Sequence, residues 1–154
     1  MSGWGGGAPL VLLAVSAIGV AGCGSSSTTT ATSIKQDVQQ VTKATLPLLP
    51  AFHQAETSGT HLDAASIETL SRTTKQAADT LKGISAPAAL QSKQQALEAS
   101  LIRLSDATAV AVTDLKGKNS PTLAHALDIQ AAIRGYHVAS IAWFNAAKTA
   151  LGQG

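Results

Sequence analysis

The stretch LQSKQQALEASLIRLSDATAVAVTDL, residues 90–115, decides the fold of this chain. Its apolar and small residues recur at alternating spacings of four and three, which is the period of an amphipathic α-helix with a heptad-like seam. The seam contains Leu90, Gln94, Leu97, Leu101, Leu104, Thr108, Ala111 and Leu115. Arg103 and Asp106 fall away from this seam. The pattern therefore predicts a long helix that packs its seam into a core.

The segments on either side repeat this period and predict three more helices. In residues 34–55 the stripe consists of Ile34, Val38, Val41, Thr45, Leu48, Phe52 and Ala55. In residues 64–84 it consists of Ile67, Leu70, Thr74, Ala77, Leu81 and Ile84. In residues 121–151 it consists of Ala126, Ile129, Ile133, Tyr136, Ser140, Phe144, Ala147 and Leu151. Because the connections are short, we expect an all-α fold, a small antiparallel up-down four-helix bundle.

Prolines and capping residues predict where these helices begin and end. Pro47 and Pro50 interrupt the first segment, which predicts either a curved helix with both prolines outward or a helix that stops and restarts. Thr60-x-x-Asp63 suits a cap for the second helix. Pro87 suits the first turn of the third helix, and Ser120-Pro121 suits the N-cap and first position of the fourth.

The amino-terminal segment has the features of a lipoprotein signal peptide. Pro9 to Val20 is an apolar run of about a dozen residues, too short to span a membrane and suited to a signal sequence. Val20-Ala21-Gly22-Cys23 follows and resembles a lipobox, although Met1 to Ala8 contain no Lys or Arg. The resemblance implies that residues 1–22 are cleaved and that Cys23 carries the lipid.

The expected domain organisation follows from this signal. Residues 23–33 contain the lipidated cysteine and a Ser/Thr run without a hydrophobic face, which predicts a flexible tether. Residues 34–154 then form the helical domain. This organisation resembles that of small helical lipoproteins of Gram-positive bacteria, particularly actinobacteria. The resemblance implies an extracytoplasmic protein anchored to the cell membrane by lipid.

Composition argues against several functional classes. The formal net charge is +2 and both signs are interspersed, whereas a nucleic-acid surface needs clustered Lys and Arg. A single cysteine excludes an intrachain disulfide and a cysteine-based metal centre. Few aromatic residues and much alanine favour closely spaced helices over strands.

The chain contains no sequence motif for catalysis or for a cofactor. It lacks Gly-x-Ser-x-Gly, Walker A, His-Glu-x-x-His and Glu-x-x-His, which hydrolase, nucleotide and di-iron sites use. We expect His125 to be solvated and His137 to lie at the margin of the fourth stripe. The sequence therefore favours a non-enzymatic binding or interaction module without a cofactor, whose partner is an envelope protein, an envelope polymer or a small ligand.

One cluster suggests an alternative function. His53 and Glu56 lie one helical turn apart, and His61 and Asp63 follow just across the expected turn. Imidazole and carboxylate groups together suit zinc. The segment around His53-x-x-Glu56 resembles the His-x-x-Glu of imelysin-like metal-associated periplasmic proteins, although Ala51 stands where that family has glycine. The resemblance implies a metal-binding accessory protein that uses the turn between the first two helices.

Overall fold

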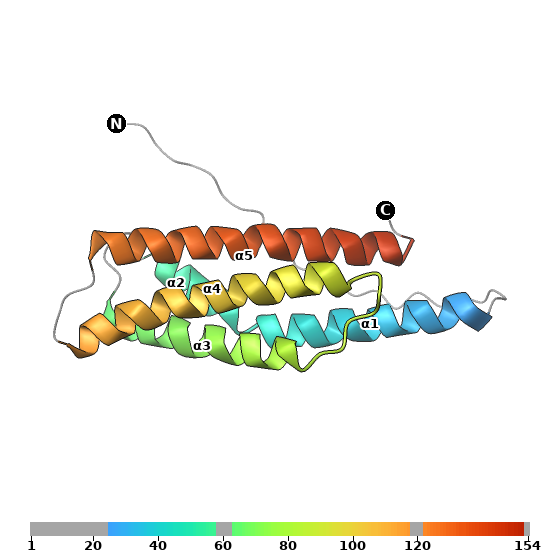
Figure 1. The fold of residues 1–154 in the computed structure, drawn as a ribbon, viewed down its shortest axis with the longest axis horizontal. Helices are drawn as coiled ribbons and strands as arrows, with labels where there is room; N and C mark the ends of the chain where they lie inside the picture. Colours follow the sequence, from blue (N-terminus) through green and yellow to red (C-terminus); the bar gives the residue numbers. More distant parts are fainter. Residues whose placement is uncertain (1–24, 58–62, 118–121, 153–154) are drawn as a thin grey trace, which may run out of the picture.

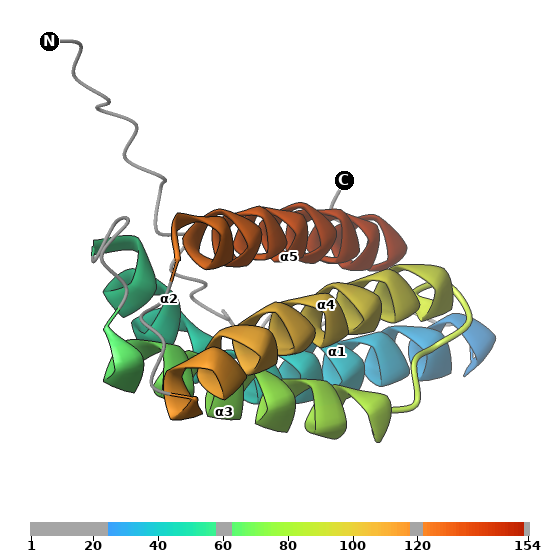
Figure 2. The ribbon, with the colours of Figure 1, turned by 60° about the vertical axis from the view of Figure 1, so that its left-hand side comes forward.

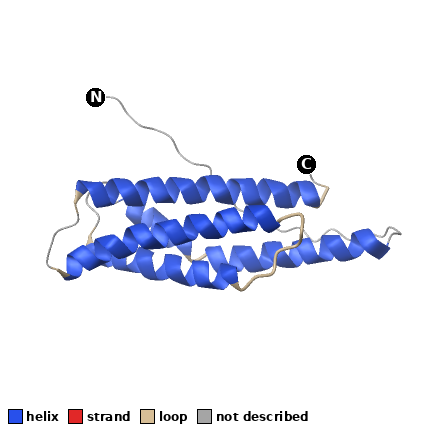
Figure 3. Cartoon of the chain, viewed as in Figure 1, coloured by secondary structure: helices blue, strands red, loops and turns tan. Residues whose placement is uncertain are grey.

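The computed structural model describes residues 25–57, 63–117 and 122–152. In these residues all regular secondary structure is helical, as Figure 3 shows, and it consists of five helices. They are α1 (Ser25–Thr45), α2 (Leu48–Thr57), α3 (Ala64–Lys82), α4 (Gln91–Lys116) and α5 (Leu123–Ala150). The all-α prediction is therefore confirmed.

The long helices lie side by side. Helix α4 packs against both α3 and α5, α2 packs against α3, and α1 contacts α3 and α5. Figures 1 and 2 show that α3 ends and α4 begins at one end of the molecule, whereas α4 ends and α5 begins at the other. Helix α1 begins at the same end as α4 and extends past it. The core lies between these helices and runs along their length.

The seam predicted for residues 90–115 forms the centre of the core. Leu90, Leu101, Leu104 and Thr108 have no exposed surface, and only Leu115 at the far end is partly exposed. The stripe predicted for residues 64–84 is also buried along α3, except that Ile84 lies beyond the helix and is half-buried. Apolar burial at these positions is the main contribution to the stability of the fold.

The first predicted helix is divided in two at Leu46 and Pro47. This outcome is the second of the two expected, a helix that stops and restarts. Pro47 lacks an N–H group and disfavours helical geometry at Leu46, so the ladder cannot continue. Pro50 is tolerated because it lies in the first turn of α2, where N–H groups need no partner within the helix. Leu48 and Phe52 still reach the core from α2.

The prediction of a flexible tether over residues 23–33 is wrong for residues 25–33, which belong to α1. Hydroxyl side chains can satisfy backbone carbonyl groups within a helix. Ser33 does so, because its Oγ donates to the Thr30 carbonyl at 2.8 Å. Ile34 is fully buried and Ala31 half-buried, so one face of these turns is covered by the rest of the fold. The helical part of the chain therefore begins upstream of residue 34.

The predicted caps differ from the observed ones by a few residues. Asp63 is itself the N-cap of α3, because its Oδ1 accepts from the Ser66 N–H at 2.8 Å. Thr122 is the N-cap of α5, whereas Ser120 and Pro121, like Thr60, lie outside the described residues. Helix α4 begins only at Gln91, since the residues after Pro87 form a turn.

The buried face of α5 is rotated from the predicted stripe near its carboxyl end. Trp143 is buried there, whereas the predicted Ser140 and Phe144 are half-buried. A helical stripe drifts against a fixed spacing over a helix of 28 residues. Burying the indole of Trp143 also removes more apolar area from water than burying Ser140 would. The exchange places an aromatic side chain in the core beside α1 and α4.

Candidate functional site

A groove of about 510 Å³ lies between α1 and α5, with α4 at its base. It is lined by Val41, Thr42, Thr45, Leu97, Tyr136, Ser140, Ile141, Trp143, Phe144 and Asn145. The chain has only four aromatic residues after Cys23, and three of them, Tyr136, Trp143 and Phe144, line this groove. A concave surface with aromatic walls and a few polar groups is typical of small-molecule sites.

Aromatic contacts with α2 hold the Tyr136 end of the groove. The rings of Tyr136 and Phe52 lie 5.1 Å apart in a tilted arrangement. His137 is exposed and meets Phe52 edge-on with ring centroids 5.6 Å apart. Burial raises the pKa of the Tyr136 phenol, and a side-chain hydrogen bond with Thr45 opposes this shift. These contacts join this end of the groove wall to α2.

Three buried side chains with unpartnered polar atoms lie on the helices that line this groove. Asp37 is 3% exposed, Gln94 5% and Trp143 4%. Both carboxylate oxygens of Asp37, Oε1 of Gln94 and Nε1 of Trp143 have no hydrogen-bond partner among the described residues. Burial raises the pKa of Asp37 to about 6. We call these three residues the polar layer, and a buried polar group without a partner requires an explanation.

A larger depression of about 820 Å³ lies between α1 and α3. Its charged and amide side chains, Gln40, Lys43, Gln76 and Asp79, are exposed. Such side chains are satisfied by water, so they give no reason for a ligand to bind. The groove beside the polar layer is therefore the stronger candidate, although it is smaller.

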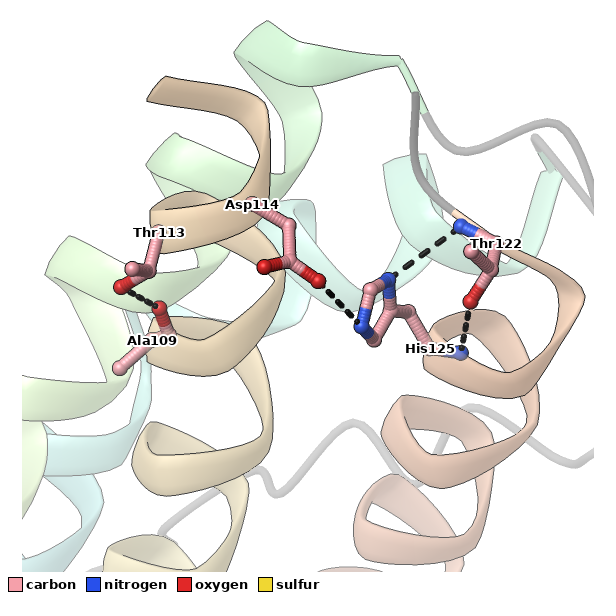
Figure 4. Close-up of polar contacts among 5 residues, drawn as sticks. All are labelled: Ala109, Thr113, Asp114, Thr122 and His125. Carbon is pink, nitrogen blue, oxygen red and sulfur yellow. Dashed lines mark hydrogen bonds and ion pairs between the residues drawn. The ribbon is translucent and has the colours of Figure 1, made fainter. Parts of the chain in front are cut away.

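His125 joins α4 to α5, as Figure 4 shows. Its Nε2 lies 3.0 Å from Oδ2 of Asp114, and its Nδ1 accepts from the Thr122 N–H at 3.2 Å. The Thr122 hydroxyl in turn accepts from the His125 N–H at 3.3 Å, which completes a capping box. The neutral ring therefore donates from Nε2 to Asp114, and we assign this cluster a structural role.

The prediction that His125 is solvated is wrong, because its side chain is only 14% exposed. The stripe of α5 places His125 beside the core, and the end of α4 covers it there. A partner on another helix cannot be deduced from the period of one helix. The only sequence signal was local: His125 stands three residues after Thr122, the spacing of a capping box.

The residues predicted to bind a metal are only partly described. His53 is exposed on α2, whereas the side chain of Glu56 and all of His61 lie outside the described residues, as does Cys23. Asp63 accepts hydrogen bonds from the Ser66 N–H and, at 2.7 Å, from the Ser66 hydroxyl. These bonds lower its pKa. Within residues 25–57, 63–117 and 122–152, no three His, Cys, Asp or Glu side chains form a group suited to a metal.

We expect zinc to bind the turn between α2 and α3 only weakly, because the Asp63 carboxylate already caps α3. Metal-free protein should be titrated with zinc in a calorimeter, together with the variants His53→Ala and His61→Ala. The expected result is weak binding that survives either substitution. Micromolar binding that both substitutions abolish would instead support the metal-binding function.

Comparison with known proteins gives no relatives: no family, curated protein or solved structure matches this chain. In the described part of the chain, none of the helices combines the length and the apolar character needed to cross a bilayer. The apolar run from Pro9 to Val20 lies outside that part.

Proposed function

We propose that this chain is a membrane-anchored extracytoplasmic lipoprotein, a non-enzymatic binding module that takes its ligand in the groove between α1 and α5. The observation that carries the proposal is Val20-Ala21-Gly22-Cys23, which follows an apolar run of signal-peptide length and stands two residues before α1. Small residues before the cysteine suit cleavage, and the Cys23 thiol accepts the lipid. The aromatic groove supports binding as the activity of the domain.

The start of α1 supports a defined distance between the domain and the membrane. Figure 1 shows the first turns of α1 extending past the ends of α4 and α5. As a helix, residues 25–33 cover about 13 Å, at about 1.5 Å per residue. A lipid on Cys23 would place this end of the domain toward the bilayer. The connection between α4 and α5 would then face away from it.

We also propose that the helices form an antiparallel up-down four-helix bundle in which α1 and α2 together count as one member. The alternating ends at which α3, α4 and α5 connect support this arrangement. So does the contact of α1 with both α3 and α5, which closes the ring of neighbours. In such a bundle, ligand sites are built from side chains on facing helices.

Lipid labelling tests the anchor. Cells that express the full chain should be grown with a labelled fatty acid, and the mature protein should be analysed by mass spectrometry. We expect the label on the wild-type protein, loss of residues 1–22, and partition into the membrane fraction. Cys23→Ala should abolish the labelling, whereas Ser25→Ala should retain it. Equal labelling of the Cys23 variant, or an intact Met1 on the mature protein, would refute the anchor.

A further inference from the structure

The three members of the polar layer lie at one level along the helices. The contact between Thr45 on α1 and Tyr136 on α5 gives a first reference level. Asp37 lies eight residues before Thr45, about 12 Å along α1. Trp143 lies seven residues after Tyr136, about 10 Å along α5 in the same direction. The contact between Asp114 on α4 and His125 on α5 gives a second reference level. Gln94 lies about 30 Å before Asp114 along α4, and Trp143 lies about 27 Å after His125 along α5.

The directions of the helices agree with this level. Asp37 lies near the middle of α1, Gln94 toward the start of α4, and Trp143 toward the end of α5. Figure 1 shows the start of α4 and the end of α5 at the same end of the molecule, with α1 extending past both, so the middle of α1 lies alongside them. All three side chains are buried, so they share one layer of the core.

The polar layer borders the groove. Trp143 lines it directly. Asp37 lies one turn from Val41 on α1, and Gln94 lies one turn from Leu97 on α4, and both Val41 and Leu97 line the groove. Residues three or four apart on a helix share a face, so the layer is adjacent to the inner end of the groove.

The orphaned atoms specify the chemistry of an occupant. Three of them are acceptor oxygens, two on Asp37 and one on Gln94, and only Trp143 Nε1 is a donor. The side-chain amide of Gln94 cannot be flipped without losing a hydrogen bond, because its Nε2 already donates to the Ile84 carbonyl at 2.9 Å. An excess of acceptors beside a carboxylate repels an anion and favours a donor that carries positive charge. A primary ammonium group has three N–H donors and one positive charge.

We propose that the polar layer and the groove together bind a primary amine with an apolar tail. The ammonium group donates to Asp37 and Gln94, and the tail lies against Tyr136, Trp143 and Phe144. The aromatic walls also favour a cation, because the face of an aromatic ring attracts positive charge. This inference shares with the proposed function only the choice of the groove as the ligand site, and it does not depend on the lipid anchor.

Calorimetry with phenethylammonium as the probe tests this site. The full chain should be purified in mild detergent and titrated in phosphate buffer, beside two variants. Asp37→Asn removes the charge at constant shape, and Asp79→Asn changes an exposed carboxylate as the matched control. We expect Asp37→Asn to weaken binding by about tenfold to a hundredfold, because a charged hydrogen bond is lost. Asp79→Asn should bind as the wild type does.

Related probes separate the contributions of charge and of N–H donors. Phenethyl alcohol and phenylpropionate have the same ring without the cation, and we expect neither to bind. Phenethyltrimethylammonium keeps the cation without N–H donors and should bind more weakly than the primary amine. Equal binding by the Asp37→Asn variant, equal binding of the quaternary probe, or no binding of the primary amine by the wild type would each overturn the proposal.

The Cys23→Ala variant separates this inference from the proposed anchor. We expect the unlipidated chain to bind phenethylammonium as the wild type does. Loss of labelling without loss of amine binding therefore leaves the site intact. Conversely, a labelled protein that does not bind the amine would refute the site and leave the anchor standing.

Discussion

Replacing Leu101 with alanine is expected to lower the free energy of unfolding by about 2–5 kcal/mol. Leu101 lies in the middle of α4 and has no exposed surface. The substitution removes buried methyl and methylene groups and leaves a cavity between α3 and α5, which cannot both move inward to fill it. Denaturant unfolding followed by circular dichroism at the helical signal measures the change.

The neighbouring residues on α4 provide matched controls. Arg103 is exposed two residues further along, so Arg103→Ala should change the free energy of unfolding by about 0.5 kcal/mol or less. Ile102 is 46% exposed despite its apolar side chain, and Ile102→Ala should cost much less than Leu101→Ala. Equal unfolding midpoints for the Leu101 and Arg103 variants would show that the assigned buried face of α4 is wrong.

The long helices and most of the core could be predicted because they depend on local period alone. The seam of residues 90–115 matched the buried face of α4 from Leu90 to Ala111. Burial of Trp143 in place of Ser140 could not be predicted, because the rotation of α5 depends on the surfaces of α1 and α4. The extension of α1 through Ser25 was missed for a related reason, since hydroxyl residues favour disorder in isolation but are tolerated beside a docked turn.

The candidate site was harder to predict than the fold. Asp37 stands three residues after Ile34 and four before Val41, so it falls on the buried stripe and was detectable from its phase. Gln94 was placed in the seam, but nothing in the sequence indicates that its Oε1 lacks a partner. That Asp37, Gln94 and Trp143 share one level depends on the register between helices, which local patterns do not specify. Tertiary contacts such as Thr45–Tyr136 are needed to establish it.

Replacing Asp37 with asparagine is expected to stabilise the free protein at neutral and alkaline pH by up to about 3 kcal/mol. Burial raises the pKa of Asp37 from 3.8 to about 6, and no neighbouring charge contributes to this shift. The charged side chains near this level include four exposed lysines, Lys35 on α1, Lys82 on α3, Lys93 on α4 and Lys148 on α5. Glu98 on α4 is half-buried and carries the same sign of charge as Asp37. Above the raised pKa the folded protein therefore contains a buried and uncompensated carboxylate.

The sign of the pH dependence follows from the direction of this shift. Because the folded-state pKa is raised, the contribution of Asp37 to stability is fully present below pH 3.8 and is lost as the pH rises through about 6. The asparagine side chain does not ionise, so the stability of the Asp37→Asn variant does not fall over this pH range. The two proteins should therefore unfold at similar denaturant concentrations near pH 3.8, and the variant should become the more stable one as the pH rises past the folded-state value.

Unfolding curves at several pH values, in phosphate or acetate rather than an amine buffer, measure this difference. Asp79→Asn serves as the control, since that carboxylate is exposed and pairs with Lys75 on the surface of α3. A stability gain that is the same at every pH would refute the assignment of the effect to a buried charge. Phenethylammonium adds a second criterion. An ammonium group that neutralises Asp37 should reduce the difference in free energy of unfolding between the wild type and the Asp37→Asn variant at alkaline pH.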